Sequence, residues 1–492
     1  MSNFRKILSV IVCLMLVAGV FSGCGEDYKE AVVYLELLEK PQTLDPQMAQ
    51  TDSELLIVRN IYEGLLREDN GEIKNGITKS YSQENLTYTF KLRDDALWSN
   101  GDKVTAYDFE YAFKRAVDPK TEAPFAGRLF SILNAEAIAN GTADISTLGV
   151  KAEGETTLKI TLCREDQNFL KTLTTSICMP CNEKFFEDSI GKYGLDSECI
   201  ISNGSYRLTK WNKEDFGIRI YKNEEYTGAF QSQNGAVFIS CVDKEKQLDR
   251  LNGGQSDMAF VGGAELADVS KTELKTKNVQ NICWFMTISQ NYSAEVRRAF
   301  ALGFSTDLYT SNLPSGFSAA KSIYPNILGI NTDNVGITQY NLDEAKSIMS
   351  KEIASMKDKK FPQATLYYYN VDGVKNLATS IVGHWQQNFS TFINIEASDN
   401  LAVIQNELSQ SSLDFALFPI AVKGDTFDEY AKNFKAITTA TSPEALQQEL
   451  LSKHTVLPVA YQTTDIAYIP LLENVNVSDD NGYIDFSTII KR

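Results

Sequence analysis

A pair of cysteines separated by two residues is the motif in this chain with the most obvious chemistry. Cys178 and Cys181 enclose Met179 and Pro180, and the stretch that follows, NEKFFEDSI, has a helical pattern. A thiol at the start of a helix can have a lowered pKa and can exchange disulfides. The surrounding sequence has no thioredoxin-like pattern, which disfavours redox catalysis. The two cysteines can instead form a structural disulfide or remain free thiols.

Other patterns that support catalysis or metal binding are weak. The two histidines, His384 and His454, do not lie at ligand spacing from the cysteines, and a structural zinc ion needs four ligands. Residues 253–257 (GGQSD) and 262–265 (GGAE) lack the lysine of a phosphate-binding loop and the spacing of a dinucleotide-binding loop. We therefore expect no metal, no cofactor and no enzymatic activity.

Size and charge limit the class of protein. The chain has 492 residues, more than one hydrophobic core usually supports, so two or three lobes are expected. Hydrophobic residues make up 43% and charged residues 23%, which is typical of a globular protein. The formal net charge of −17 opposes contact with phosphate backbones, so a nucleic-acid partner is not expected.

The N-terminus has the pattern of an export signal. Two basic residues precede the apolar run 7–20, which is too short for a permanent membrane-spanning helix. The following VFSGCG resembles a bacterial lipobox, with Phe21 where leucine is usual. The resemblance implies removal of residues 1–23, lipid attachment to Cys24 and a short tether over residues 24–29. The alternative is an ordinary signal peptide with an incidental cysteine.

The elements that must position any site alternate between strand and helix patterns, which predicts an α/β protein. Residues 88–92 alternate apolar and polar side chains, as in a half-buried strand. Thr105 is a good helix N-cap, with Asp108 three residues later. Apolar residues then recur at helical spacing up to Pro119, which ends the helix. These signals agree, so we expect a rigid strand-turn-helix unit.

The same stretch resembles a known family. Residues 87–119, TYTFKLRDDALWSNGDKVTAYDFEYAFKRAVDP, are similar to the signature segment of the dipeptide/oligopeptide/nickel-binding proteins that serve ABC importers. The similarity covers most of residues 30–345 and thins afterwards. Further stretches that resemble the family are TLDP (43–46), YEGL (62–65), LGVKA (148–152), NGSYRLTKW (203–211), VRRAFALGFSTD (296–307), YNLDEAKSIM and VLPVAY.

The resemblance implies an α/β, two-lobed periplasmic-binding-protein type II fold with an extra inserted α/β domain. It further implies a monomeric protein held by its lipid on the extracytoplasmic side of the cell membrane. Such a protein captures oligopeptides, or a small peptide-like solute, between two closing lobes and delivers them to ABC permease subunits. The implied boundaries are 30–62, 178–268 and 456–492 for lobe I, 63–177 for the extra domain II, and 269–455 for lobe II (domain III).

The resemblance also implies where ligand contacts lie. One set follows the first strand, a second set lies on the strand within residues 413–427, and a third ends the strand ATLYYYN. The implied ligand-binding residues are Lys40, Pro41, Gln42, Tyr369, Asn370, Ile420, Ala421, Val422 and Lys423.

Two of these positions depart from the peptide-binding pattern. Ile420 replaces a tryptophan, and Lys423 stands where an acidic residue meets the amino terminus of the peptide. Three explanations remain open: Asp425 or Asp428 is the acid in a shifted alignment, the ligand has a carboxylate that Lys423 meets, or the site has decayed. In the last case the chain is an interaction or scaffold lipoprotein that retains the fold and has lost the transport ligand.

Overall fold

The structure is a computed structural model, and residues 1–31 and 32–492 form separate units within it. It describes residues 31–37, 39–69, 71–211, 217–240, 246–262, 264–333, 335–371, 373–405, 412–422, 427–434, 438–477 and 483–492. The predicted signal peptide, the tether with Cys24, and Lys423 lie outside these residues. The following description concerns the second unit.

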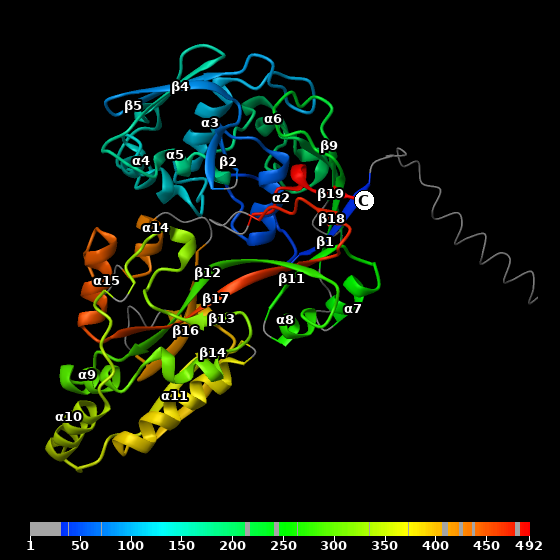
Figure 1. The fold of residues 1–492 in the computed structure, drawn as a ribbon. Helices are drawn as coiled ribbons and strands as arrows, with labels where there is room; N and C mark the ends of the chain where they lie inside the picture. Colours follow the sequence, from blue (N-terminus) through cyan, green and yellow to red (C-terminus); the bar gives the residue numbers. More distant parts are fainter. Residues whose placement is uncertain are drawn as a thin grey trace, which may run out of the picture. The chain divides into compact units, whose positions relative to one another are not determined.

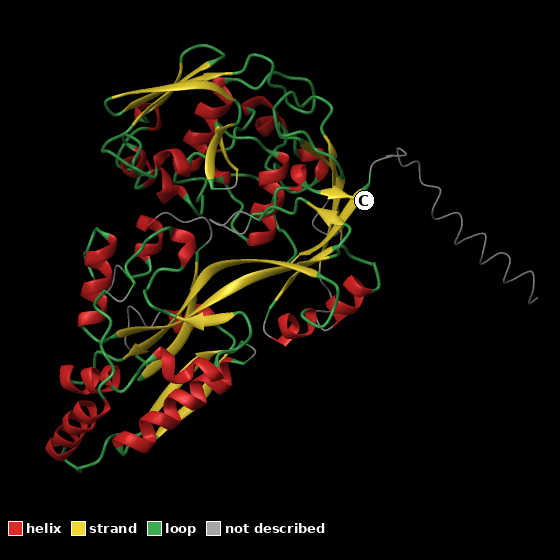
Figure 2. Ribbon diagram, in the orientation of Figure 1, coloured by secondary structure: helices red, strands yellow, loops and turns green. Residues whose placement is uncertain are grey.

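Eleven of the described strands join in one sheet, in the order β15-β14-β16-β12-β17-β11-β1-β10-β9-β8, with β13 paired to β17 (Figures 1 and 2). The strands are β1 (Val32–Leu37), β8 (Tyr206–Lys210), β9 (Gly217–Lys222), β10 (Gly235–Ser240), β11 (Met258–Val261), β12 (Lys275–Ile288), β13 (Phe317–Ala319), β14 (Ala364–Tyr369), β15 (Ile393–Ser398), β16 (Phe415–Ala421) and β17 (Val456–Tyr468).

Two sets of parallel strands flank a long antiparallel pair in this sheet. β1 runs parallel to β10 and β11, and β14 runs parallel to β15 and β16. Between the two sets, β12 and β17 pair along almost their whole length, from Lys275 opposite Tyr468 to Thr287 opposite Val456 (Figure 1). β12 and β17 therefore connect the two halves of the sheet.

Helices and smaller sheets complete the described chain. The helices are α2 (Asp52–Ile61), α3 (Ala106–Val117), α4 (Ala135–Ala139), α5 (Phe169–Thr172), α6 (Glu183–Asp188), α7 (Gln247–Asn252), α8 (Ala264–Val269), α9 (Ala294–Leu302), α10 (Leu342–Ser355), α11 (Val374–Phe389), α12 (Leu401–Gln405), α14 (Phe427–Lys432) and α15 (Pro443–Ser452). The remaining strands are β2 (Leu66–Asp69), β3 (Glu72–Asn75), β4 (Thr78–Glu84), β5 (Thr87–Leu92), β6 (Val150–Ala152), β7 (Thr157–Thr161), β18 (Leu472–Glu473) and β19 (Ile490–Lys491). Within the part of the chain that is described, none of the helices has the length and apolar character needed to cross a membrane.

The predicted strand-turn-helix unit is confirmed. β5 and α3 have the expected positions, and β5 belongs to a four-stranded sheet of order β4-β5-β7-β6. The Asp108 carboxylate accepts from the Thr105 backbone N–H at 2.7 Å, and Thr105 and Asp108 form a capping box. Asp118 caps the C-terminal end of α3, immediately before Pro119. Local sequence signals were sufficient here because the contacts that define the unit are close in sequence.

The hydrophobic core is divided in the same way as the sheet. One cluster joins β1, α2, β5, α3 and the C-terminal segment, and it includes Trp98 and Trp211. Two further clusters lie around β12, β14, β16 and the start of β17, one with Trp284 and Trp385, the other with Tyr324 and Tyr430. The first cluster contains residues of β1 and α2 as well as residues of the four-stranded sheet, so this sheet packs firmly onto β1 and α2.

Candidate functional site

The carboxyl ends of the two parallel sets meet at the middle of β12 and β17. β11 ends at Val261, which is opposite Asp465 of β17, and Asp465 is opposite Asn278 of β12. β16 ends at Ala421, opposite Ile282 of β12. Ligands of open α/β sheets bind outside the carboxyl ends of the strands. Because both sets end within the same short stretch of β12, this junction is the candidate ligand-binding site.

The middle of these two strands differs from their flanks. Residues 462–464 of β17 are half-buried and lie between fully buried runs on both sides. Residues 280–282 of β12 are also half-buried, and the strand register shifts between Gln280 and Ile282. We call Gln280, Asn281, Gln462, Thr463 and Thr464 the polar centre.

Two side chains of the polar centre keep unused hydrogen-bond donors. The Thr464 hydroxyl donates to Asn281 Oδ1 at 3.0 Å, and Trp284 Nε1 donates to Gln462 Oε1 at 2.7 Å. These bonds fix the orientation of both amides through their oxygen atoms. Among the described residues, neither Asn281 Nδ2 nor Gln462 Nε2 has a hydrogen-bond partner. An amide NH₂ group has two donors, so both side chains can donate to carbonyl or carboxylate oxygens of a ligand.

A buried acid lies next to the polar centre on β17. Asp465 is 2% exposed, and burial raises the pKa of its carboxyl group. Its Oδ2 is 2.6 Å from the Thr463 hydroxyl oxygen, which is 3.1 Å from the Gly316 carbonyl oxygen. One hydroxyl proton cannot serve both acceptors. A protonated Asp465 satisfies both bonds, because it donates to Thr463 while Thr463 donates to Gly316.

A single glutamate organises the loop that follows β1. Glu54 Oε1 accepts from the backbone N–H groups of Gln42 (2.8 Å) and Thr43 (3.2 Å). Its Oε2 accepts from those of Gln50 (3.0 Å) and Thr51 (3.1 Å). Glu54 is 2% exposed and is also the third residue of a capping box at the start of α2. Glu54 was not among the residues predicted from the sequence, although a threonine followed three residues later by a glutamate is a recognisable capping-box pattern.

The predicted first-strand residues lie on this loop with different exposures. Lys40 is half-buried, Pro41 is buried and Gln42 is exposed. The Gln42 side chain donates to the Lys40 carbonyl at 3.1 Å. Gln42 therefore presents its side chain at the surface while its backbone N–H is used by Glu54.

The predicted residues on β16 divide between core and surface. Ile420 and Val422 are 3% and 1% exposed and belong to the hydrophobic cluster around Tyr430. Ala421, between them, is exposed. The Val422 backbone N–H donates to the Asn281 carbonyl at 2.8 Å, which attaches this strand end to the polar centre. Among the described residues 419–422 at this strand end, Ala421 is therefore the one that is exposed.

The end of β14 lies on the same sheet edge as the end of β16, because the two strands are parallel neighbours. Tyr369 is half-buried and packs against both clusters of this half of the sheet. Asn370 is exposed, and its Nδ2 donates to Asp399 Oδ1 at 2.9 Å. The structure thus brings Tyr369, Asn370 and Ala421 to one edge, whereas Lys40, Pro41 and Gln42 follow β1 in the other parallel set.

Of the two alternatives for Cys178 and Cys181, a disulfide or free thiols, the structure has the free thiols, and both are buried. Cys178 lies in the large N-terminal core, whereas Cys181 lies in a separate cluster with Ala112 and Tyr193. Burial raises the pKa of each thiol to about 12, although Arg115 Nη1 lies 3.4 Å from the Cys181 sulfur. Neither thiol is therefore a reactive thiolate at neutral pH.

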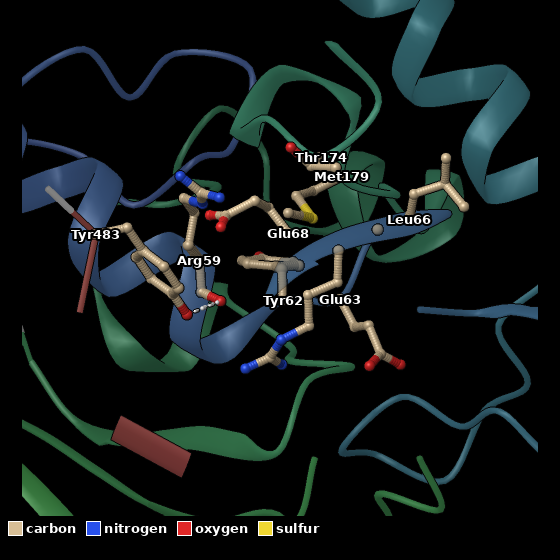
Figure 3. Close-up of a pocket in the computed structure, with 10 residues that line it drawn as sticks. Arg59, Tyr62, Glu63, Leu66, Glu68, Thr174, Met179 and Tyr483 are labelled. Atoms are coloured by element: carbon tan, nitrogen blue, oxygen red, sulfur yellow. Dashed lines mark hydrogen bonds between the residues drawn. The ribbon is translucent and has the colours of Figure 1, made fainter. Parts of the chain in front are cut away.

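A small cavity between α2, β2 and the C-terminal segment is a second polar site (Figure 3). The Tyr483 hydroxyl donates to the Arg59 carbonyl at 3.0 Å, and the Arg59 guanidinium lies 4.3 Å from the centre of the Tyr483 ring. The cavity volume is about 20 Å³, room for one water molecule. The lining residues are Arg59, Tyr62, Glu63, Gly64, Leu66, Arg67, Glu68, Thr174, Met179 and Tyr483. A cavity of this size excludes a peptide, so we assign it a structural role.

Comparison with known proteins identifies the family of this chain. The family model described as bacterial extracellular solute-binding proteins, family 5, middle, matches residues 72–440. The chain is 25% identical over 426 residues to the oligopeptide-binding protein OppA of Bacillus subtilis, covering 80% of this chain and 78% of that relative. Within the described ranges, no group of three histidine, cysteine, aspartate or glutamate side chains could hold a metal ion.

Solved structures show the same fold. The Escherichia coli murein tripeptide-binding protein MppA has a TM-score of 0.74 and 21% identity, with coverage of 94% of this chain and 99% of that one. The pheromone receptor PrgZ has a TM-score of 0.75 and 22% identity, with coverage of 94% and 100%. The predicted α/β fold, a two-lobed periplasmic-binding-protein type II fold with an extra inserted domain, is confirmed. The chain belongs to family 5 of the bacterial extracellular solute-binding proteins.

Proposed function

We propose that this protein is an extracytoplasmic solute-binding protein of an ABC importer that captures peptides or a small peptide-like solute. The observation that carries the proposal is the junction at β12 and β17, where two sets of strand ends meet a polar centre with free amide donors. Family membership supports it, as do relatives described as oligopeptide-binding and murein tripeptide-binding proteins.

The polar centre supplies donors that suit a peptide. Asn281 Nδ2 and Gln462 Nε2 can donate to the carbonyl or terminal carboxylate oxygens of the ligand, and each amide is already oriented by a bond to its oxygen. Preorganised donors lose little side-chain freedom on binding. The main chain of Ala421 adds one donor and one acceptor at the end of β16.

Lobe closure is the second part of the proposal. We assign residues 30–62, 178–268 and 456–492 to lobe I, 63–177 to the extra domain and 269–455 to lobe II. In this division β12 and β17 are the crossing strands that connect the lobes, and the register shift near Asn281 is the natural place for the bend. A ligand that contacts both lobes favours the closed state by its differential affinity for that state.

Membrane attachment through Cys24 completes the proposal. It rests on the VFSGCG motif in the sequence, and several acyl chains give stable anchoring. Labelled fatty acid should be incorporated into the wild-type protein in cells and not into Cys24→Ser, which should appear in the soluble extracytoplasmic fraction. Equal labelling of the two proteins would contradict lipid attachment at Cys24. The expected membrane partners are the permease subunits of the importer.

A thermal-shift screen tests ligand capture. Pools of mixed-sequence peptides should raise the unfolding temperature, because a ligand that binds only the folded state stabilises it by RT ln(1 + [L]/Kd), about 2.7 kcal/mol at a hundred times Kd. Sugars, nucleotides and divalent metals at the same concentration are the controls. A shift with none of the peptides would contradict the proposal and favour an interaction lipoprotein that has lost its ligand.

A further inference from the structure

The main chain of β16 divides its hydrogen-bonding groups between two neighbours. Ser289 N–H donates to the Asp414 carbonyl at 2.9 Å, and Val422 N–H donates to the Asn281 carbonyl at 2.8 Å. In an antiparallel pair, alternate residues direct their N–H and C=O groups to the same neighbour. Residues 414, 416, 418, 420 and 422 therefore face β12, whereas 415, 417, 419 and 421 face the β14 side.

The β14 side of β16 becomes an open edge before the strand ends. β14 pairs with β16 only as far as Tyr368 opposite Leu417. Beyond this pair, Pro419 and Ala421 are the residues of β16 that face the edge. A ligand that binds as an added strand would need their N–H and C=O groups.

Pro419 and its neighbour Gln405 block most of this edge. Proline has no backbone N–H to donate. The Pro419 carbonyl is already used, because it accepts from Gln405 Nε2 of α12 at 3.0 Å. Ala421 is thus the one residue of β16 beyond Pro419 that can pair with a ligand backbone.

The loop after β1 is equally poor in available donors. Pro41 has no N–H, and the N–H groups of Gln42 and Thr43 donate to Glu54. The Leu44 N–H donates to the Gly194 carbonyl at 2.8 Å, and that of Glu39 lies 3.4 Å from the Ser53 hydroxyl. Over the described residues 39–44 and 412–422, neither of these strand ends therefore offers a run of available main-chain N–H groups.

We propose that this site recognises its ligand through side chains of the protein and through the terminal groups of the ligand. We propose further that it selects di- and tripeptides, or peptide-like solutes of that size, over extended oligopeptides. Among residues 412–422 of this segment, which the structure describes, Ala421 is the one pairing residue at the edge, and it holds about one residue of a ligand main chain. The polar centre supplies the other contacts, through the free amide donors of Asn281 and Gln462. Pro419 and Gln405 are the residues that set this limit. The inference rests on the proposed function and adds the length of the ligand.

Native mass spectrometry of the full protein tests the inference. The protein is incubated with an equimolar mixture of random dipeptides, tripeptides and octapeptides, and bound peptides are identified after free peptides are removed. Dipeptides and tripeptides should be enriched over octapeptides by at least about tenfold. Octapeptides bound as well as the short peptides would overturn the inference while the proposed function stands. Binding of none of the peptides would overturn both.

Variants of the blocked edge give an independent readout. Pro419→Ala restores an N–H group and Gln405→Ala releases a carbonyl, so the double variant should bind octapeptides about tenfold better than the wild type. The matched controls are Pro362→Ala and Gln448→Ala, at exposed positions of the same half of the chain. Octapeptide binding by a folded double variant that stays at the wild-type level would overturn the role of Pro419 and Gln405. If the double variant does not fold, the length preference of the wild type still decides the proposal.

Discussion

Asp465 shows how burial can shift the pKa of a carboxyl group. It is a buried acid that is hydrogen-bonded to the hydroxyl of Thr463, and burial raises the pKa of its carboxyl group. The neutral form satisfies the hydrogen bonds around it, whereas the ionised form leaves two acceptors competing for one hydroxyl proton. Ionisation of Asp465 at neutral pH therefore opposes folding.

The substitution Asp465→Asn should stabilise the protein at pH 7. A raised folded-state pKa gives stability that is present below the unfolded pKa of about 3.9 and is lost as pH rises through the folded value. Asparagine avoids this loss, so the variant should be more stable than the wild type at pH 7 and equal to it near pH 3.5. Urea unfolding midpoints at the two pH values measure the difference.

The control for Asp465 is Asp144, whose pKa is shifted in the opposite direction. Asp144 is exposed, and hydrogen bonds from Ser146 lower the pKa of its carboxyl group. Its contribution to stability is present above the unfolded pKa and is lost as pH falls through the folded value. Asp144→Asn should therefore give no gain at pH 7. A variant Asp465→Asn that is less stable than the wild type at pH 7 would contradict the account.

At the scale of elements, Glu54 connects the start of α2 to the loop after β1. It accepts four backbone N–H bonds, from residues 42, 43, 50 and 51, while it is almost completely buried. A helix capping residue usually serves its own helix. Glu54 also fixes the loop that carries Lys40, Pro41 and Gln42.

Glu54→Ala should destabilise the protein by about 3 kcal/mol, because it leaves several buried N–H groups without an acceptor. It should also weaken peptide binding, since the loop after β1 loses its support. Glu72→Ala is the matched control, because Glu72 is exposed and pairs with Lys74 on a surface hairpin. Unfolding midpoints and peptide affinity measured on both variants make the comparison. Equal stability of the two variants would show that Glu54 does not organise the loop.

Prediction from sequence succeeded where the signals were local. The strand at 88–92, the helix after Thr105 and its end before Pro119 were all correct, since each depends on neighbouring residues. The choice between a disulfide and free thiols stayed open because spacing alone does not show that Cys178 and Cys181 lie in different clusters. The polar centre was missed because it forms only when β12 and β17, far apart in sequence, pair in one register.

For the candidate site, sequence similarity indicated segments whose role stays a prediction, and it did not show which of their side chains are buried. Ile420 and Val422 are core residues, and only their neighbour Ala421 is exposed. The alternation of side chains along a strand could have shown that Ala421 lies on the opposite face from Ile420 and Val422. It does not show which of the two faces packs against the core. The interpretation of Lys423 remains a prediction, because this residue lies outside the described part of the chain.

At the scale of the whole molecule, the account depends on one site built from both halves of the sheet. The end of β11 belongs to the first half, and the ends of β14 and β16 belong to the second. The polar centre lies on the strands that both halves share. We expect a ligand held there to contact both halves of the sheet, which is the requirement for coupling capture to closure.

Calorimetric titration of a captured short peptide tests this claim most directly. The wild-type protein is compared with the double variant Asn281→Asp/Gln462→Glu, which keeps the oxygens that accept from Thr464 and Trp284 and removes both free amide donors. Gln448→Glu, at an exposed position of α15, is the control. The account predicts one peptide per wild-type chain, at least about tenfold weaker binding by the double variant, and wild-type affinity for the control. Equal peptide affinity of the wild type and the double variant would contradict it.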